Sequence, residues 1–199
     1  MHISLKKPAR IPTVNQCFSL MEEYEMLDNI KKHSIVVARV SDFLVRNLIY
    51  NGYDLSVELT VSGALLHDIA KTESIKEGGN HSDMGSDICF SRNMPEVAEI
   101  VMQHILLDES SLEEISEKHI VYYADKRVLH DKVVNLDERL AYLIARYGNG
   151  IAALEEHIRS NFEICKIVEK KLFLDLSFAP EDLTTLMEHE KFESLPLGN

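Results

Sequence analysis

The sequence has few cysteines, and those present form no recognisable pattern. Cys17, Cys89 and Cys165 are far apart and odd in number, and no CxxC pair occurs. This spacing argues against a disulfide framework and against a cysteine zinc knuckle. A protein of the reducing cytoplasm fits this usage best.

Long apolar runs, glycine and proline are also scarce. No uninterrupted apolar run approaches the roughly 18 residues that cross a bilayer, and the N-terminus lacks the apolar core of a signal peptide. The chain has only eight glycines and five prolines in 199 residues, with an ordinary 45% hydrophobic and 27% charged content. Together with long amphipathic stretches, these counts predict a single all-α domain, a helical bundle.

Basic residues are also few relative to acidic ones. There are 21 Lys and Arg against 33 Asp and Glu, a formal net charge of −12. An acidic surface repels polyanions and anionic lipid, so we expect neither nucleic acid nor a membrane as partner. A small phosphorylated substrate remains compatible with this charge, because bound divalent cations can neutralise it locally. The oligomeric state cannot be read from the sequence.

Apolar periodicity and capping signals divide the chain into helices and loops. We predict an irregular segment over 1–12 and a polar loop over 72–80. The predicted helices cover about 14–26, 27–50, 55–70, 81–90, 95–107, 118–129, 136–146, 151–171 and 180–191. The expected organisation is a lead-in and first helix over 1–26, a metal-binding core over 27–146 and packing helices over 147–199.

Two of these helices carry ionisable residues on faces that should be buried. His33 falls inside the apolar stripe of the second helix, and His67 and Asp68 end the apolar run of the third. A buried ionisable pair needs a neutralising partner. A hydrogen-bonded His-Asp pair and a metal site are both compatible with this motif, and the motif alone does not choose between them.

Recurrence of the same feature favours a metal. His81, His104 and Asp125 also lie at or near apolar faces, and convergence on one centre would satisfy all these groups together. Four ligands suffice for one ion, and a bridging Asp68 would let the two remaining histidines hold a second, about 3.5–4 Å away. Histidine and aspartate suit two divalent transition-metal ions such as Fe, Mn, Zn, Co or Ni. The candidate ligands are His33, His67, Asp68, His81, His104 and Asp125.

The order of these residues resembles the HD superfamily of metal-dependent phosphohydrolases. It is similar to the two-metal branch, which includes bacterial symmetrical diadenosine tetraphosphate hydrolases and cyclic-di-GMP phosphodiesterases. The likeness spans roughly residues 27–146. It is carried by His33-Ser34, by Leu65-Leu66-His67-Asp68-Ile69-Ala70-Lys71, by Asn80-His81 with Gly85, by Val101-Met102-Gln103-His104 and by Tyr123-Ala124-Asp125-Lys126.

The resemblance implies roles for particular residues. The first ion would be held by His33, His67, Asp68 and Asp125, and the second by His81 and His104, with Asp68 shared. Lys71 would contact the substrate phosphate. Apart from the resemblance, the basic residues close after Asp125 could help to bind an anion, and a solvated helix face explains them equally well; they are Arg127, Lys126 and Lys132. The implied reaction is hydrolysis of a phosphoester or phosphoanhydride of a nucleotide-like molecule by metal-activated water, with Asp68 and Lys71 as catalytic residues. The GYP motif of cyclic-di-GMP enzymes is absent, which argues against that substrate.

Two other functions stay open at this point. An HD-type di-iron oxygenase would use the same ligands, and a nucleotide-sensing module would bind metal without catalysis. The intact ligand set with Lys71 argues against the sensing module. Four other histidines lie in charged surroundings and are expected at the surface; they are His119, His130, His157 and His189.

Overall fold

The all-α prediction is confirmed. The computed structural model describes residues 10–108, 110 and 112–190. Their helices are α1 (Val14–Glu23), α2 (Asp28–Tyr50), α3 (Val57–Leu66), α4 (Lys71–Glu77), α5 (His81–Ser91), α6 (Pro95–Gln103), α7 (Glu117–Lys126), α8 (Leu136–Leu143), α9 (Ala152–Leu172) and α10 (Leu183–His189). The shorter elements are strands β1 (Val128–Leu129) and β2 (Lys132–Val133), a π-helical turn η2 (Ile144–Gly148) and a 3-10 turn η3 (Pro180–Asp182). No helix in this part of the chain combines the length and apolarity needed to cross a bilayer.

Helix starts follow the capping signals of the sequence. Thr13 and Gln16 each accept the other's backbone N–H and so begin α1, at 3.0 and 3.3 Å. Asn135 and Glu138 form the same reciprocal pair and begin α8, at 2.8 and 3.3 Å. Each pair satisfies two N–H groups that lack a partner inside the helix.

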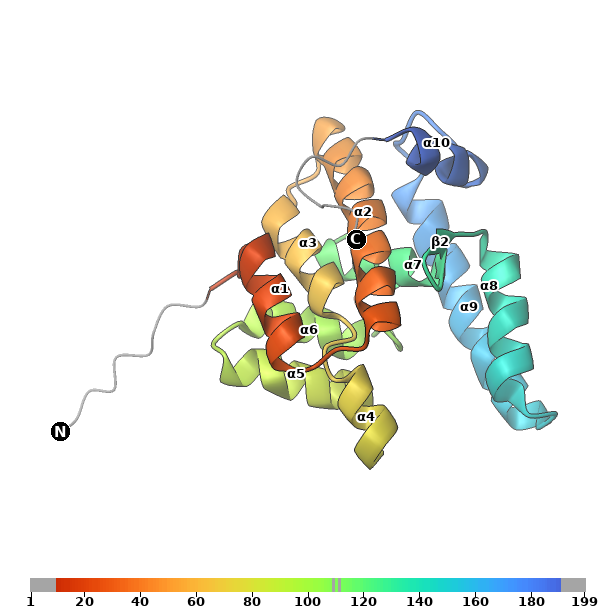
Figure 1. Ribbon diagram of the computed structural model, residues 1–199. Helices are drawn as coiled ribbons and strands as arrows, with labels where there is room; N and C mark the ends of the chain where they lie inside the picture. The colour runs from red at the N-terminus through yellow and green to blue at the C-terminus, as the bar shows by residue number, and fades with distance from the viewer. Residues whose placement is uncertain (1–9, 109, 111, 191–199) are drawn as a thin grey trace.

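Helix α2 is the centre of the bundle (Figure 1). It packs against α3 on one side and α7 on another, while α5 and α6 pack on each other beneath α3. Its apolar stripe is buried, including Val37, Val40, Leu44 and Leu48 at 0% exposure. His33 belongs to that stripe, so burial of the stripe turns the imidazole inward.

Two glycines let α6 approach its neighbours closely. A Cβ at Gly63 of α3 would lie 2.7 Å from Cδ1 of Ile100, and one at Gly85 of α5 would lie 2.8 Å from Cγ1 of Val101. Both contacts are shorter than carbon atoms tolerate. The absence of these two side chains therefore sets how near the end of α6, with His104, comes to α3 and α5.

The structure corrects several predicted boundaries. Helix α3 ends at Leu66, so His67 and Asp68 lie in a turn rather than in the last turn of a helix. Helix α4 occupies most of the stretch predicted as a loop over 72–80, and the antiparallel pair β1–β2 was not predicted. His119 is 1% exposed, which contradicts its expected place at the surface. Its Nδ1 accepts a hydrogen bond from the backbone N–H of Ser116 inside the protein.

The last helices form an arm beside the bundle. In Figure 1, α8 and α9 run side by side and are set off from α2. The arm is attached through α9, where Asn161 accepts from Tyr122 Oη at 2.6 Å and donates to the carbonyl of Ile105 at 2.9 Å. The predicted division into lead-in, core and packing helices stays a prediction. Residues 1–9 of the lead-in lie outside the described residues.

The close approach at Gly63 gives a stability prediction. Gly63→Val should lower the free energy of unfolding by about 1–3 kcal/mol, because the new side chain overlaps Ile100 of α6. Urea denaturation followed by circular dichroism would measure the change. Ala153→Val, on the exposed surface of α9, is the control and should change stability by less than about 1 kcal/mol. Equal effects of the two substitutions would contradict close packing at Gly63.

Candidate metal centre

The turn between α3 and α4 places two ionisable residues in the dry interior. His67 is 0% exposed and Asp68 is 2% exposed. The turn closes with the backbone N–H of Lys71 donating to the carbonyl of Asp68 at 2.9 Å, which starts α4. His67 and Asp68 therefore lie buried at the junction of α3 and α4.

Three histidines are fixed by the same kind of bond. The Nδ1 of His33 lies 2.9 Å from the carbonyl of His130, that of His67 lies 2.7 Å from Ala64 O, and that of His104 lies 2.6 Å from Val101 O. A carbonyl can only accept, so each Nδ1 carries the hydrogen. In the neutral ring the free lone pair is then on Nε2. Histidines that bind metals are held in this way.

The Nε2 atoms of His33 and His67 face carboxylate oxygens. His33 Nε2 lies 3.0 Å from Asp125 Oδ1. His67 Nε2 lies 3.8 Å from the same oxygen and 3.5 Å from Asp68 Oδ2, and it is buried with no hydrogen-bond partner among the described residues. Lone pairs that face each other in a dry interior require a cation between them. The site therefore fits a bound metal ion.

Asp68 presents its two oxygens to different histidines. Oδ2 faces His67, as given above, while Oδ1 lies 3.1 Å from His81 Nε2 and 3.5 Å from His104 Nε2. The ligand atoms form two groups, each within 4.8 Å: His33, His67 and Asp68, and Asp68, His81 and His104. Asp68 belongs to both groups, and Asp125 adjoins the first through His33.

The charges of the groups are consistent with a place for cations. Burial and the neighbouring His67 lower the pKa of His104 to about 4, so this ring is neutral at pH 7. Burial would raise the pKa of Asp68, but His67 and Lys71 hold it well below its usual value. Burial also opposes charge on His67, yet the carboxylates of Asp68 and Asp125 raise its pKa. The carboxylates thus attract positive charge to Nε2, which a metal ion supplies as well as a proton.

Lys71 stands at the more open side of the cluster. Its Nζ lies 3.1 and 3.3 Å from the two oxygens of Asp68, and its side chain is 34% exposed. Burial would lower the pKa of Lys71, but Asp68 and Asp125 raise it, so the ammonium stays charged. It is the cation of the predicted set that reaches both the cluster and solvent.

The other predicted anion-binding residues lie elsewhere. Arg127 is 1% exposed, and its guanidinium donates to the carbonyls of Val134 at 2.7 Å and Pro180 at 3.0 Å and to Tyr123 Oη. These bonds join α7 to the C-terminal segment and hold the guanidinium in the interior, which is at odds with the expected binding role of Arg127. Lys126 is likewise buried and donates to the carbonyl of His104 at 2.9 Å. Lys132 is exposed on β2.

Arg139 of α8 was not singled out from the sequence, yet it lies beside the cluster. Its Nη2 is 3.8 Å from Asp125 Oδ1, and its side chain is 13% exposed. Burial would raise the pKa of Asp125, but the contact with His33 lowers it and Arg139 lowers it further. Nothing in the sequence near Arg139 indicated this position, because it depends on how the β1–β2 hairpin directs α8.

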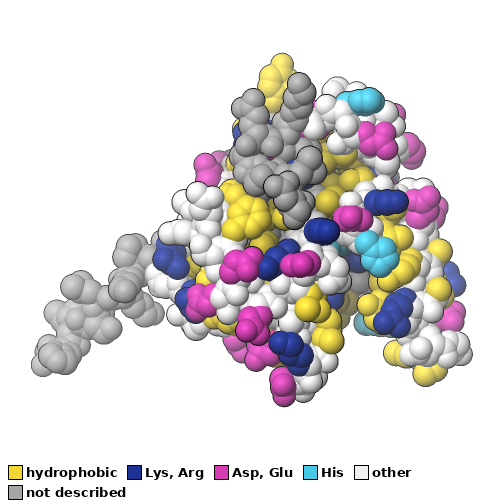
Figure 2. Space-filling model, in the orientation of Figure 1, with side chains coloured by type: hydrophobic (Ala, Val, Ile, Leu, Met, Phe, Trp, Pro, Cys, Tyr) yellow, Lys and Arg dark blue, Asp and Glu magenta, His cyan; other side chains and the backbone are white. Residues whose placement is uncertain are grey.

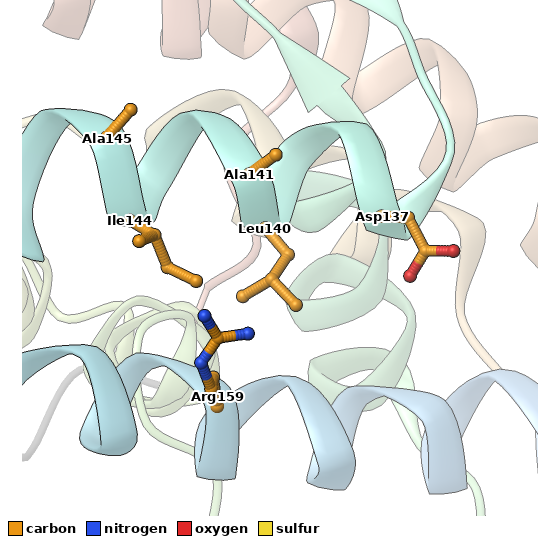
Figure 3. Close-up of a pocket in the computed structure, with 6 residues that line it drawn as sticks. All are labelled: Asp137, Leu140, Ala141, Ile144, Ala145 and Arg159. Carbon is orange, nitrogen blue, oxygen red and sulfur yellow. The ribbon is translucent and has the colours of Figure 1, made fainter.

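A separate cavity of about 440 Å³ lies on the arm. Figure 3 shows Leu140 of α8 and Ile144 of η2 pointing toward α9, and Arg159 pointing from α9 toward them. The lining also includes Asp137, Ala141 and Ala145. None of the six predicted ligands lines it, so this cavity and the histidine cluster are different places.

Fold and site together define an all-α protein with a buried histidine-aspartate cluster that could hold a metal ion. Residues 30–128 match the family model of the HD domain, and this segment contains all six predicted ligands. Over this segment the chain is therefore similar to the HD-domain family, whose members are generally metal-dependent phosphohydrolases. The resemblance read from the motifs is confirmed at this level.

The comparisons also give one relative. The chain is 26% identical over 156 residues to an uncharacterized protein of Methanocaldococcus jannaschii, covering 71% of this chain and 91% of that protein. No solved structure matches the chain significantly.

Metal binding is tested by removing the shared carboxylate. Asp68→Ala should abolish Mn²⁺ binding in calorimetry, because Asp68 is common to both ligand groups. In the native protein, Mn²⁺ at 100 times its dissociation constant should stabilise the fold by about 2.7 kcal/mol per site. The variant should keep its helical circular dichroism but show no such stabilisation. Asp87→Ala, exposed on α5, is the control and should bind Mn²⁺ normally. Normal Mn²⁺ binding by Asp68→Ala would contradict the assignment.

Proposed function

We propose that the protein is a two-metal phosphohydrolase. It cleaves a phosphoester or phosphoanhydride of a small nucleotide-like molecule and binds two divalent transition-metal ions, such as Fe, Mn, Zn, Co or Ni. The observation that supports this most is the position of Asp68, whose two oxygens face separate sets of histidines at 3.1–3.5 Å. That arrangement suits a carboxylate that bridges two ions.

Most of the histidine and aspartate side chains at the site would hold the ions. His33, His67 and Asp125 would hold one ion with Asp68, and His81 and His104 would hold the other. Ions in such a site lower the pKa of a bound water toward 7 and neutralise the phosphoryl oxygens. The described protein residues therefore need not supply a nucleophile.

Lys71 provides a charge that the ions do not. Its ammonium touches Asp68 and is partly exposed, so it can contact the substrate phosphate from the solvent side. When the substrate gains negative charge in the transition state, a fixed ammonium stabilises that charge. Asp68 and Lys71 are the catalytic residues of this proposal.

A small substrate agrees with the surface better than a macromolecular polyanion. Figure 2 shows acidic and basic side chains mixed over the face in view, and the net charge is −12. We propose a nucleotide-like substrate, with neither nucleic acid nor membrane as partner, and a cytoplasmic location. Among HD families the motif order is similar to that of the symmetrical diadenosine tetraphosphate hydrolases, so dinucleoside polyphosphates belong in the first substrate screen.

Activity is tested by that screen. Purified protein loaded with Mn²⁺, Fe²⁺ or Co²⁺ should release phosphate or nucleotide from at least one mononucleotide or dinucleoside polyphosphate, as measured by chromatography. Removal of the metal with a chelator should stop turnover, and adding metal back should restore it. Full turnover by chelated protein would disprove the metal-dependent mechanism.

The role of Lys71 gives a separate prediction. Lys71→Ala should keep its bound metal and lose turnover on the order of a hundredfold, because a fixed charge at the phosphate is removed. Steady-state kinetics and metal analysis of the same sample would measure both. Lys166→Ala, exposed on α9, is the control and should match the native protein. Unchanged kinetics in Lys71→Ala would show that Lys71 does not act on the substrate.

A further inference from the structure

Arg139 of α8 lies beside the cluster and leaves a side-chain donor unused. Its Nε atom is buried and has no hydrogen-bond partner in the described part of the chain. By contrast, Arg127 donates from Nε to a carbonyl at 2.7 Å, and Arg46 donates from Nε to Asp42 at 2.9 Å. A buried donor without an acceptor is unfavourable by about 1–3 kcal/mol, so an acceptor from outside the chain would be stabilised there.

The guanidinium is held beside the cluster by contacts that leave its donors free. Arg139 Cζ lies 5.9 Å from the ring centre of Tyr142, and the Tyr142 ring meets His130 edge to face at 5.3 Å. The carbonyl of His130 is the acceptor that fixes His33 Nδ1. The position of Arg139 is therefore coupled to that of a metal-ligating histidine through the tip of the β1–β2 hairpin.

The only carboxylate recorded near Arg139 in the described residues is Asp125. Its Oδ1 is 3.8 Å from Arg139 Nη2, too long for a hydrogen bond, and it is already 3.0 Å from His33 Nε2. A metal ion held by His33 and Asp125 would neutralise this carboxylate further. Arg139 then has charge and donors that the protein does not use.

We propose that Arg139 binds a phosphate group of the substrate, the part that the sequence suggested for Arg127. This inference rests on the proposed function. Lys71 contacts Asp68, and Arg139 lies near Asp125. Each carboxylate of the ligand set therefore has one cationic side chain beside it. Two ions would exceed the charge of these two carboxylates, so the site with Lys71 and Arg139 has surplus positive charge and selects an anion. The planar guanidinium offers paired donors that match phosphate oxygens.

Calorimetry with inorganic phosphate tests this on the full-length, Mn²⁺-loaded protein. Arg139→Gln should bind phosphate at least tenfold more weakly than the native protein, with the same Mn²⁺ content. Arg139→Lys should fall between them, because it keeps the charge but loses the paired donors. Arg159→Gln, on the neighbouring helix of the arm and exposed, is the matched control and should bind phosphate normally.

The outcomes separate this inference from the proposed activity. Phosphate affinity within twofold of native in Arg139→Gln, or no phosphate binding by the native Mn²⁺-loaded protein, would overturn the role of Arg139 even if a substrate is hydrolysed. Weakened phosphate binding in a protein that hydrolyses nothing would keep the anion site and reject the hydrolase. If Arg139→Gln loses helicity, Arg139→Lys decides: affinity at least threefold weaker supports the inference, and equal affinity overturns it.

Discussion

The structure depends on an electrostatic conflict inside a dry helical core. The Nε2 lone pairs of His33, His67 and His104 point toward the carboxylates of Asp68 and Asp125, where water is excluded. Such an arrangement is stable only when positive charge is placed among the acceptors. Bound metal ions would meet this requirement, so the same groups that would weaken an ordinary core make this one suited to hold metal.

The fold serves this arrangement by fixing distances through the backbone. Three imidazoles are anchored by carbonyl groups, two of which lie three residues earlier in the same helix or turn. Gly63 and Gly85 allow α6 to come close, which brings His104 within 3.3 Å of His81. Anchoring by main-chain groups tolerates change elsewhere in the helices, because it depends on helix geometry and not on particular side chains.

The acidic composition and an anionic substrate are compatible because charge acts locally here. The chain as a whole carries −12, whereas the site pairs the carboxylates of Asp68 and Asp125 with Lys71 and Arg139 before any ion is added. Divalent ions would then make the centre positive within an acidic protein. Over the distances between surface charges, salt screens most of the repulsion that the remaining acidic groups exert.

Local patterns predict most of the helices, the inward position of His33 and the ligand candidates, since a helix period and a capping box involve only neighbouring residues. They missed α4 and the β1–β2 hairpin, whose short segments carry little periodicity, and they could not distinguish Arg127 from Arg139. The contacts of the folded chain show that Arg127 donates to carbonyl groups, including that of Pro180, whereas Arg139 lies beside the cluster. The physical reason is that side-chain partners of long-range contacts depend on how helices are directed in space, which no local pattern encodes.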